Sequence, residues 1–291
     1  MKPTISSIIG GTRRELLAMP WEEYLAYPGL NCSTIKQGEK SMLHLKHQWD
    51  SDGKSTDAML FGRLLHCMLF EPGEVVARYW PWKGVRRGKA YDEWRFRAGV
   101  AGAELVRDEG AYSLEIATEA AQGFLRNSRV KELIAAGQAE QTVLAVEGDI
   151  QCKGRLDWVS TSEHVLTDLK TTAAIEPGLF GKTFFNFGYD ISLGTYRRWL
   201  NSVTGDRWPV EVIVLESKPP YDVAVIPVPD AVLDAGADKA MALIAKVRHA
   251  IEVDEWPGIA QDQPMPLVIP YYVMRENEDN ELQVEWDSDN D

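Results

Sequence analysis

Alternation of apolar and polar side chains predicts two adjacent β-strands near the middle of the chain. Residues 150–160 (IQCKGRLDWVS) and 165–170 (VLTDLK) both alternate polar positions with apolar or β-branched ones, and the intervening residues 161–164 are polar. A period of two is typical of a strand with one buried face. The pattern therefore predicts a β-hairpin with a four-residue turn, in which Ser160 pairs with Val165.

This register brings charged side chains together. It sets Asp157 opposite Asp168 and Arg155 opposite Lys170 on one face of the hairpin, with facing Cβ atoms about 5 Å apart. Two opposed carboxylates repel each other, so the pattern favours a divalent cation between them, with the ammonium of Lys170 beside it. The alternative is a solvated hairpin face on which Asp–Lys and Asp–Arg pairs form. In either case the apolar residues are expected to face away from the charges, into a core: Leu156, Trp158, Leu166 and Leu169.

The rest of the hydrophobic pattern predicts more helices than strands. Helices are expected over residues 20–27, 33–48, 57–70, 90–107, 111–136, 189–203 and 230–252. Further strands are expected over residues 141–148, 210–217 and 221–228. Because these strands gather around the hairpin, the predicted fold class is α/β, with a central mixed β-sheet flanked by helices.

The composition fits one large folded domain. The chain has 291 residues, of which 45% are hydrophobic, and no Pro/Gly/Ser-rich linker divides it. Cys32, Cys67 and Cys152 are widely spaced and form no Cys-x-x-Cys pattern, so reduced, buried thiols are expected rather than disulfides or a zinc site. No leader-like segment and no apolar run of roughly 20 residues occurs, so a soluble, cytoplasmic protein without membrane contact is expected.

The charge is unevenly distributed, which matters for a nucleic-acid partner. The net charge is −13, but residues 275–291 alone contain eight acidic residues against Arg275. Residues 78–97 contain seven Lys or Arg, two acids and six interleaved aromatic residues. Cations neutralise phosphates and aromatic faces stack on unpaired bases, so this segment predicts a strand-binding surface. The alternative is that its tryptophans are core residues with a solvated basic rim. The candidate DNA contacts in this segment are Trp82, Arg86, Arg87 and Lys89.

Other residue patterns add a histidine and a glutamate and exclude two functional classes. His66 lies on the flank of an apolar ridge in the predicted helix 57–70, where a hydrogen-bonded core histidine is commoner than a metal ligand. Glu140 opens the strand before the hairpin, either as a distal carboxylate near the site or as a surface strand end. The chain contains neither a Gly-x-x-x-x-Gly-Lys-Ser/Thr loop nor Gly-x-Ser-x-Gly, which argues against an NTP-driven motor and a serine hydrolase.

The order of these motifs resembles the PD-(D/E)xK nuclease superfamily, through Asp157 followed by Asp168-x-Lys170. Within it, the chain is similar to the exodeoxyribonuclease VIII (RecE-type) branch, a relative of lambda exonuclease. Residues 62–72 (GRLLHCMLFEP) resemble that branch's histidine-bearing helix, and residues 189–196 (YDISLGTY) its Gln-x-x-x-Tyr helix. Residues 33–36 (STIK) and 255–258 (EWPG) agree as well.

The resemblance covers residues 24–259 and leaves an N-terminal segment, 1–23, and an acidic C-terminal tail, 260–291. It departs from the family pattern at Ser192, which stands where the family has glutamine. The amide that would contact substrate or metal-bound water is therefore missing, although Tyr196 is present.

The resemblance implies a restriction-endonuclease-like core and a metal-dependent exonuclease that hydrolyses double-stranded DNA ends 5′→3′ for recombination or repair. Mg²⁺, or Mn²⁺ in its place, is expected at Asp157, Asp168 and the Leu169 carbonyl, with His66 completing this site or a second metal position, while Lys170 positions the attacking water. Tyr196, Arg155 and Arg197 are expected to hold the substrate strand.

The same resemblance implies a homo-oligomeric ring, with a single-strand annealing protein as a possible partner. Two alternatives stay open. One is a structure-specific endonuclease of the same superfamily, and the other is a catalytically weakened DNA-binding protein that kept the fold.

Overall fold

The computed structural model describes residues 3–51, 55–260 and 264–267 of the chain. The chain divides into two compact units, Met1–Trp256 and Pro257–Asp291. The first unit contains every helix and strand of the described residues. The acidic residues 275–291 lie outside the described residues.

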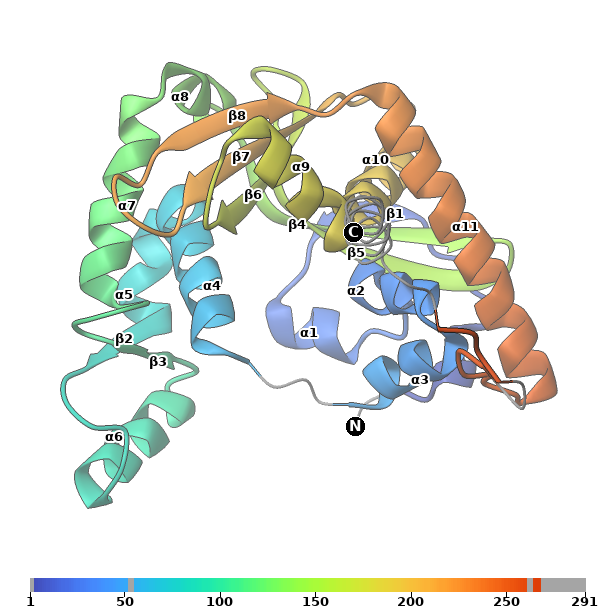
Figure 1. Ribbon diagram of the computed structural model, residues 1–291, viewed down its shortest axis with the longest axis horizontal. Coiled ribbons are helices and arrows are strands. Elements are labelled where there is room, and N and C mark those ends of the chain that lie inside the picture. Colours follow the sequence, from blue (N-terminus) through green and yellow to red (C-terminus); the bar gives the residue numbers. More distant parts are fainter. Residues whose placement is uncertain (1–2, 52–54, 261–263, 268–291) are drawn as a thin grey trace, which may run out of the picture. The chain divides into compact units, whose positions relative to one another are not determined.

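A six-stranded mixed β-sheet forms the centre of the first unit and confirms the predicted α/β class (Figure 1). The strand order is β1-β4-β5-β6-β7-β8, and all neighbours are antiparallel except β6 and β7. The strands are β1 (Glu15–Ala18), β4 (Gly137–Glu147), β5 (Ile150–Ser160), β6 (Val165–Thr172), β7 (Val210–Glu216) and β8 (Val223–Pro227). A separate parallel pair consists of β2 (Tyr79–Trp82) and β3 (Glu104–Arg107).

Helices cover both faces of the sheet and enclose a separate core on each. One core lies under α2 (Cys32–Ile35), α3 (Met42–Asp50), α9 (Pro177–Asn186), α10 (Tyr189–Thr204) and α11 (Asp230–Val253). The other lies under α4 (Asp57–Phe70), α7 (Leu114–Arg126) and α8 (Ser128–Ile134). The remaining helices are η1 (Ile5–Ile8), α1 (Trp21–Ala26), η2 (Lys36–Glu39), η3 (Pro72–Glu74), α5 (Val75–Arg78) and α6 (Lys89–Val100). None of the described helices is both long and apolar enough to cross a bilayer.

Side chains in the sequence fix where several helices begin. The hydroxyl oxygens of Ser41, Thr56 and Ser113 each accept a hydrogen bond from the backbone N–H three residues later, at the starts of α3, α4 and α7. Such caps satisfy N–H groups that have no partner inside the helix. The predicted helix 57–70 is confirmed residue for residue as α4.

Three predicted helices are interrupted. Residues 33–48 form α2, η2 and the start of α3, while 111–136 form α7 and α8, with the side chain of Asn127 capping α8. Residues 90–107 form α6 and then the strand β3, because Gly102, at φ 73°, adopts the left-handed conformation that ends a helix.

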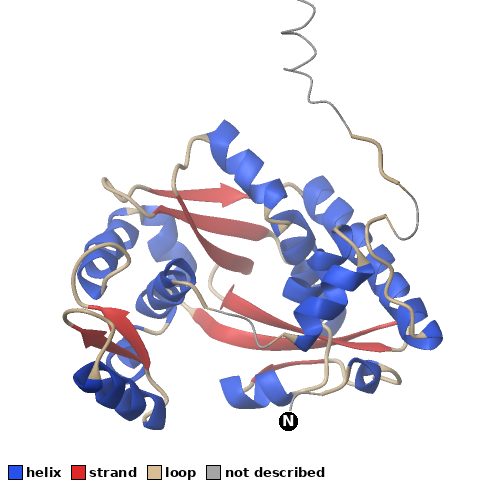
Figure 2. Cartoon of the chain, turned by 60° about the horizontal axis from the view of Figure 1, so that its bottom comes forward, coloured by secondary structure: helices blue, strands red, loops and turns tan. Residues whose placement is uncertain are grey.

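The hairpin strands β5 and β6 separate where the two candidate aspartates lie. Their ladder begins with the predicted pair Ser160–Val165 and ends at Trp158–Thr167. Beyond this pair β5 stays bonded to β4 and β6 stays bonded to β7, so the sheet forks between two sets of strands (Figure 2). We refer to this point, just past Trp158 and Thr167, as the fork.

The predicted ladder pairs Asp157–Asp168 and Arg155–Lys170 are both wrong, because the β5–β6 ladder has ended before these residues. Arg155 lies opposite Thr142 of β4 instead. Its guanidinium donates to Glu140 at 2.5 Å and to the carbonyl oxygen of Met19 at 2.9 Å, and so stays within the β4 side of the fork.

On β4 and β5, side chains an even number of residues apart would share one face of a regular strand. Near the fork they lie on opposite faces of the sheet. Leu156 packs into the core under α10, whereas Trp158, two residues later, packs into the core under α4. On β4, Val143 and Ala139 divide between the two cores in the same way. Between them lies Glu140, at φ 53°, where the otherwise continuous β4–β5 pairing is interrupted.

The change of face on β5, together with the odd spacing of Leu166 and Leu169 on β6, corrects a second expectation. The four apolar hairpin residues do not share one face: Leu156 and Leu166 lie in the core under α10, and Trp158 and Leu169 lie in the core under α4. All four are nevertheless buried, as expected. The three cysteines are free and buried as well.

Two glycines allow α10 and α11 to touch. A Cβ atom at Gly194 would lie 2.1 Å from the carbonyl oxygen of Leu233, and one at Gly236 would lie 2.0 Å from that of Asp190. No side chain fits at either position, so glycine sets the approach of the two helices. Because α10 also carries Tyr189 and Tyr196, this contact determines where those rings lie.

We expect Gly236→Ala to lower the free energy of unfolding by about 1–3 kcal/mol or more, the usual cost of overpacking, because the Asp190 carbonyl is backbone and cannot turn aside. Gly99→Ala in α6 is the matched control, since nothing lies within 4 Å of its added Cβ atom. The control should be neutral or stabilising by up to about 1 kcal/mol. Chemical denaturation measures both, and equal stabilities would contradict the close approach.

Candidate active site

Four side chains meet at the fork: Asp157 from β5, Asp168 and Lys170 from β6, and His66 from α4. Asp157 Oδ2 accepts a hydrogen bond from the Leu169 N–H at 2.9 Å and lies 3.4 Å from His66 Nδ1. Asp168 forms an ion pair with the ammonium of Lys170. None of the four side chains is more than 23% exposed. The structure therefore brings together the residues that the motifs singled out.

The contacts of His66 orient its ring between Leu169 and Asp157. Nε2 lies 3.0 Å from the carbonyl oxygen of Leu169. A carbonyl only accepts, so Nε2 carries the proton and Nδ1 keeps its lone pair. Burial lowers the pKa of His66, and the ammonium of Lys170 lowers it further. The neutral ring thus presents Nδ1 toward Asp157, with a backbone carbonyl holding its orientation.

The two carboxylates share a single ammonium. Burial raises the pKa of Asp157 well above its usual range, and the charge of Asp168 adds to the shift. Burial lowers the pKa of Lys170, but Asp168 and Asp157 raise it by more, so its pKa is raised overall. With both acids ionised and His66 neutral, the cluster carries one net negative charge, which a bound cation would compensate.

The donor set at the fork suits a hard divalent cation. Asp157 and Asp168 offer carboxylate oxygens and Leu169 a carbonyl oxygen, which suit Mg²⁺ and Mn²⁺, and His66 adds an imidazole nitrogen, a donor that transition metals prefer. Among the residues that the structure describes, no three His, Cys, Asp or Glu side chains already form a metal cage. Asp168 is held in its ion pair with Lys170.

Glu140 adds a third acid beside Asp157, on the neighbouring strand β4. Its charge also raises the pKa of Asp157, after burial and Asp168. The guanidinium of Arg155, which lies over the ring of Trp21 with 5.4 Å to the centroid, neutralises Glu140. Arg155 is thus engaged inside the protein, although the sequence suggested a DNA contact.

Tyr196 and Ser192 share a face of α10, but only the tyrosine reaches the strands of the fork. A Cβ atom at Gly154 would lie 2.9 Å from the ring of Tyr196, which explains the glycine that opens the Gly-Arg-Leu-Asp motif. The hydroxyl of Ser192 donates to the Gly188 carbonyl of its own helix at 3.2 Å. At the position where the RecE-type pattern has glutamine, the chain therefore has a serine whose hydroxyl bonds within its own helix.

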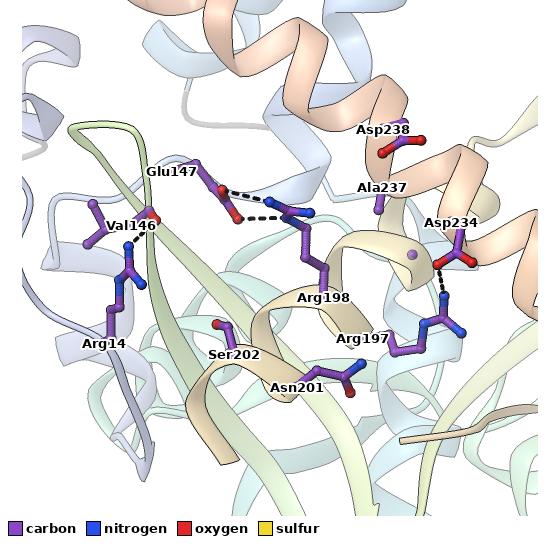
Figure 3. A pocket seen from close by; sticks show the side chains of 11 residues that line it. Arg14, Val146, Glu147, Arg197, Arg198, Asn201, Ser202, Asp234, Ala237 and Asp238 are labelled. Carbon is purple, nitrogen blue, oxygen red and sulfur yellow. Dashed lines mark hydrogen bonds and ion pairs between the residues drawn. The ribbon is translucent and has the colours of Figure 1, made fainter. Parts of the chain in front are cut away.

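Arg197 does not join the cluster. It is buried and pairs with Asp234, at 2.5 Å, and with Asp230 of α11. It lines a cavity of about 710 Å³ between α10, α11 and the end of β4 (Figure 3). Arg198 in the same cavity is paired with Glu147 at 3.1 Å. The cavity and the fork are separate places, and the titratable groups that suit metal chemistry lie at the fork.

The aromatic residues of the basic segment pack mainly against one another. Trp82 lies edge-on to Tyr91 with ring centroids 5.4 Å apart, and its indole N–H donates to the Val85 carbonyl. Trp80 and Trp94 are 5.3 Å apart. The three tryptophans are half-buried, so their rings pack in pairs and still keep part of their surface in water.

The cations of the segment differ in their partners. Arg86 pairs with Asp57, the first residue of α4, at 2.5 Å, and Arg107 pairs with the same carboxylate. Arg87 is exposed, and Lys89 has a side chain that is 91% exposed and lies 3.9 Å from Glu93. Arg87 and Lys89 are thus more available to a ligand than Arg86.

Two further residues, Tyr189 and Lys36, lie beside the cluster without a predicted role. Lys170 Nζ lies 4.9 Å from the ring centroid of Tyr189, and Lys36 Nζ lies 5.9 Å from it. Lys36 lies in the motif 33–36 and Tyr189 in the motif 189–196, both of which supported the resemblance. The sequence predicts no role for either residue.

Comparison with known proteins places the chain among PDDEXK-like domains. Residues 32–262 match the family described as "PDDEXK-like domain of unknown function (DUF3799)". The crystal structure of a "Putative exonuclease" from Eubacterium rectale superimposes with a TM-score of 0.60 at 14% identity, covering 89% of this chain and 98% of that one. A phage-related exonuclease from Haemophilus somnus 129PT reaches a TM-score of 0.33 at 12% identity, covering 78% and 96%, too loose a likeness to add to the first. No curated protein matches the chain.

We expect Asp157→Asn to raise the thermal stability of the metal-free protein at neutral pH. Because the folded-state pKa of Asp157 lies above the unfolded value, ionisation costs stability above the raised pKa, and the cost is absent below the ordinary value of 3.8. The gain should therefore shrink as the pH falls toward that value. Thermal unfolding in EDTA across this range measures it, with the exposed Asp206→Asn as control. A gain that does not depend on pH would contradict the assigned cause.

Proposed function

Because the chain belongs to the family of PDDEXK-like domains, we propose that it is a metal-dependent nuclease that hydrolyses phosphodiester bonds at the fork. The observation that carries the proposal is the convergence of Asp157, Asp168, Lys170 and His66 at the point where β5 and β6 separate. Two carboxylates crowded into a largely buried place are costly without a cation, and the family supplies the reaction class in which that cation is used.

The residues of the fork have different roles in the proposed reaction. Asp157, Asp168, His66 and the Leu169 carbonyl would hold Mg²⁺ or Mn²⁺, which supplies polarisation of the phosphate and a nucleophile at neutral pH. Lys170 has a raised pKa and stays an ammonium. It is therefore suited to orienting water and to stabilising charge that develops on the phosphate oxygens, rather than to accepting a proton.

The substrate that we propose is a duplex DNA end, degraded 5′→3′ in recombination or repair. This finer assignment rests on the RecE-type resemblance, as do a homo-oligomeric ring and a single-strand annealing partner. An endonuclease would use the same cluster. A weakened, DNA-binding relative is suggested by Ser192, whereas the intact set of acids, histidine and lysine favours an active enzyme.

End-labelled linear duplex DNA, incubated with the protein in Mg²⁺ and in EDTA, tests the proposal. Release of labelled nucleotides in Mg²⁺ alone is the expected result. A closed circular duplex of the same sequence should resist digestion, and its cleavage would identify an endonuclease. Inactivity on both substrates with Mg²⁺ or Mn²⁺ would sink the nuclease proposal.

We expect Lys170→Ala to lower kcat by about 10²–10³-fold, as loss of a group that stabilises transition-state charge does, with little change in the Kd for DNA. Lys246→Ala on the exposed side of α11 is the matched control and should leave both constants unchanged. Single-turnover cleavage and binding in EDTA measure the two constants separately. Equal, modest losses in rate and affinity would make Lys170 only a phosphate contact.

We expect the double variant Arg87→Ala, Lys89→Ala to bind DNA of any sequence more weakly. The slope of log K against log salt should flatten by about 0.9 for each duplex phosphate that the variant no longer neutralises. Arg86→Ala should act chiefly on stability, since it leaves Asp57 to Arg107 alone. Salt titrations beside a Lys131→Ala, Lys246→Ala control, both exposed, measure the slopes. An unchanged slope in the double variant would place the DNA path elsewhere.

A further inference from the structure

An aromatic ring projects into solvent next to the fork, at the joint between α9 and α10. Phe187 is 59% exposed and stacks on Tyr189, with centroids 5.8 Å apart and 25° between the planes. Tyr189 in turn lies edge-on to the buried Phe184, at 5.9 Å and 84°. Phe187 is therefore supported from the core on one side while most of its ring remains in water.

Single exposed hydrophobic residues are common and need no explanation by themselves. Phe187 differs from such isolated residues because two lysine ammonium groups lie near the ring pair that it forms with Tyr189. Lys36 Nζ donates to the Phe187 carbonyl at 3.1 Å, and both Lys36 and Lys170 approach the ring of Tyr189. Gly188, at φ 63°, makes the turn that packs this joint against Lys36.

The two lysines favour an anion between them. Lys36 Nζ lies 5.9 Å and Lys170 Nζ lies 4.9 Å from the ring centroid of Tyr189, so two positive charges lie around one ring. Asp168 compensates Lys170, whereas the hydrogen-bond partner of Lys36 is a neutral carbonyl. A phosphate would be attracted by both cations, and it would lie at the edge of the cluster proposed to cut phosphodiesters.

We propose that Phe187, Tyr189, Lys36 and Lys170 bind one unpaired nucleotide of the strand being cut, with its base stacked on Phe187 and its phosphate at the two lysines. The inference rests on the proposed nuclease function and specifies its substrate. Every nucleobase has a π-face, so such a platform accepts any sequence but requires the base to be out of the duplex stack. The site therefore takes frayed or single-stranded ends in preference to a firmly paired blunt end.

A single-stranded oligonucleotide with 2-aminopurine at its terminal position tests the stack in EDTA, where the metal-dependent reaction is off. Binding should quench the fluorescence, because the base stacks on an aromatic ring. Phe187→Ala should abolish the quenching and raise the Kd by about 5–150-fold, the range for loss of one base–aromatic stack. Phe187→Trp should retain both the quenching and the affinity.

Leu179→Ala is the matched control, since Leu179 is 52% exposed on the neighbouring helix α9 and is apolar without being aromatic. It should leave quenching and affinity unchanged. A blunt, G·C-clamped duplex should be bound with much less loss on Phe187→Ala than the single strand. Unaltered quenching in a Phe187→Ala variant with a normal unfolding temperature would overturn the inference, as would equal losses in the Leu179 control.

The two proposals fail separately. Hydrolysis in Mg²⁺ without any Phe187-dependent stacking would overturn the nucleotide platform and leave the nuclease intact. Phe187-dependent stacking without hydrolysis in Mg²⁺ or Mn²⁺ would overturn the nuclease and support a nucleic-acid-binding platform.

Discussion

Repulsion between Asp157 and Asp168 in a largely buried place is the constraint on which the rest of the site depends. Charges that leave water cost several kcal/mol each unless they are paired or hydrogen-bonded. The fold supplies the Leu169 N–H to one acid and the Lys170 ammonium to the other, and Arg155 removes the charge of Glu140 nearby. These compensations hold the acids in place without cancelling their charge, and the remaining repulsion falls when Asp157 takes up a proton or when a cation binds.

The fork makes such crowding possible, because diverging strands open the middle of a sheet to groups from both of its faces. His66 reaches Asp157 from α4, while Lys36 and Tyr189 reach Lys170 from the opposite face. Contacts away from the fork position both the helix that bears His66 and the helix that bears Tyr189. Asp57, tied to Arg86 and Arg107, anchors the first turn of the helix that bears His66, and the glycine contact with α11 fixes the helix that bears Tyr189.

The sequence predicted the parts of this site that follow from local patterns. The polar tetrad defined the turn, the alternation defined the register Ser160–Val165, and the family match confirms the superfamily read from Asp157, Asp168 and Lys170, whereas its RecE-type branch stays a prediction. The pattern could not show where the ladder ends, because strand separation depends on which neighbours β5 and β6 keep. It also missed the change of face at Glu140, since a non-glycine residue at positive φ has no sequence signature and is held by tertiary contacts.

The arginines and the lysines near the site have different partners, which the sequence alone could not distinguish. Arg155, Arg197 and Arg86 were all expected to meet DNA, and in the structure each pairs with a carboxylate of the protein. A planar guanidinium offers several fixed donors to a carboxylate, so arginine is well suited to joining elements through acids, whereas a lysine ammonium is a compact charge on a flexible stem. The two cations that approach Tyr189 at the fork, Lys36 and Lys170, are both lysines. In an acidic chain with 44 acids and 31 lysines and arginines, these three arginines pair with acids, whereas Lys36 bonds the Phe187 carbonyl and Lys170 pairs with Asp168 inside the site itself.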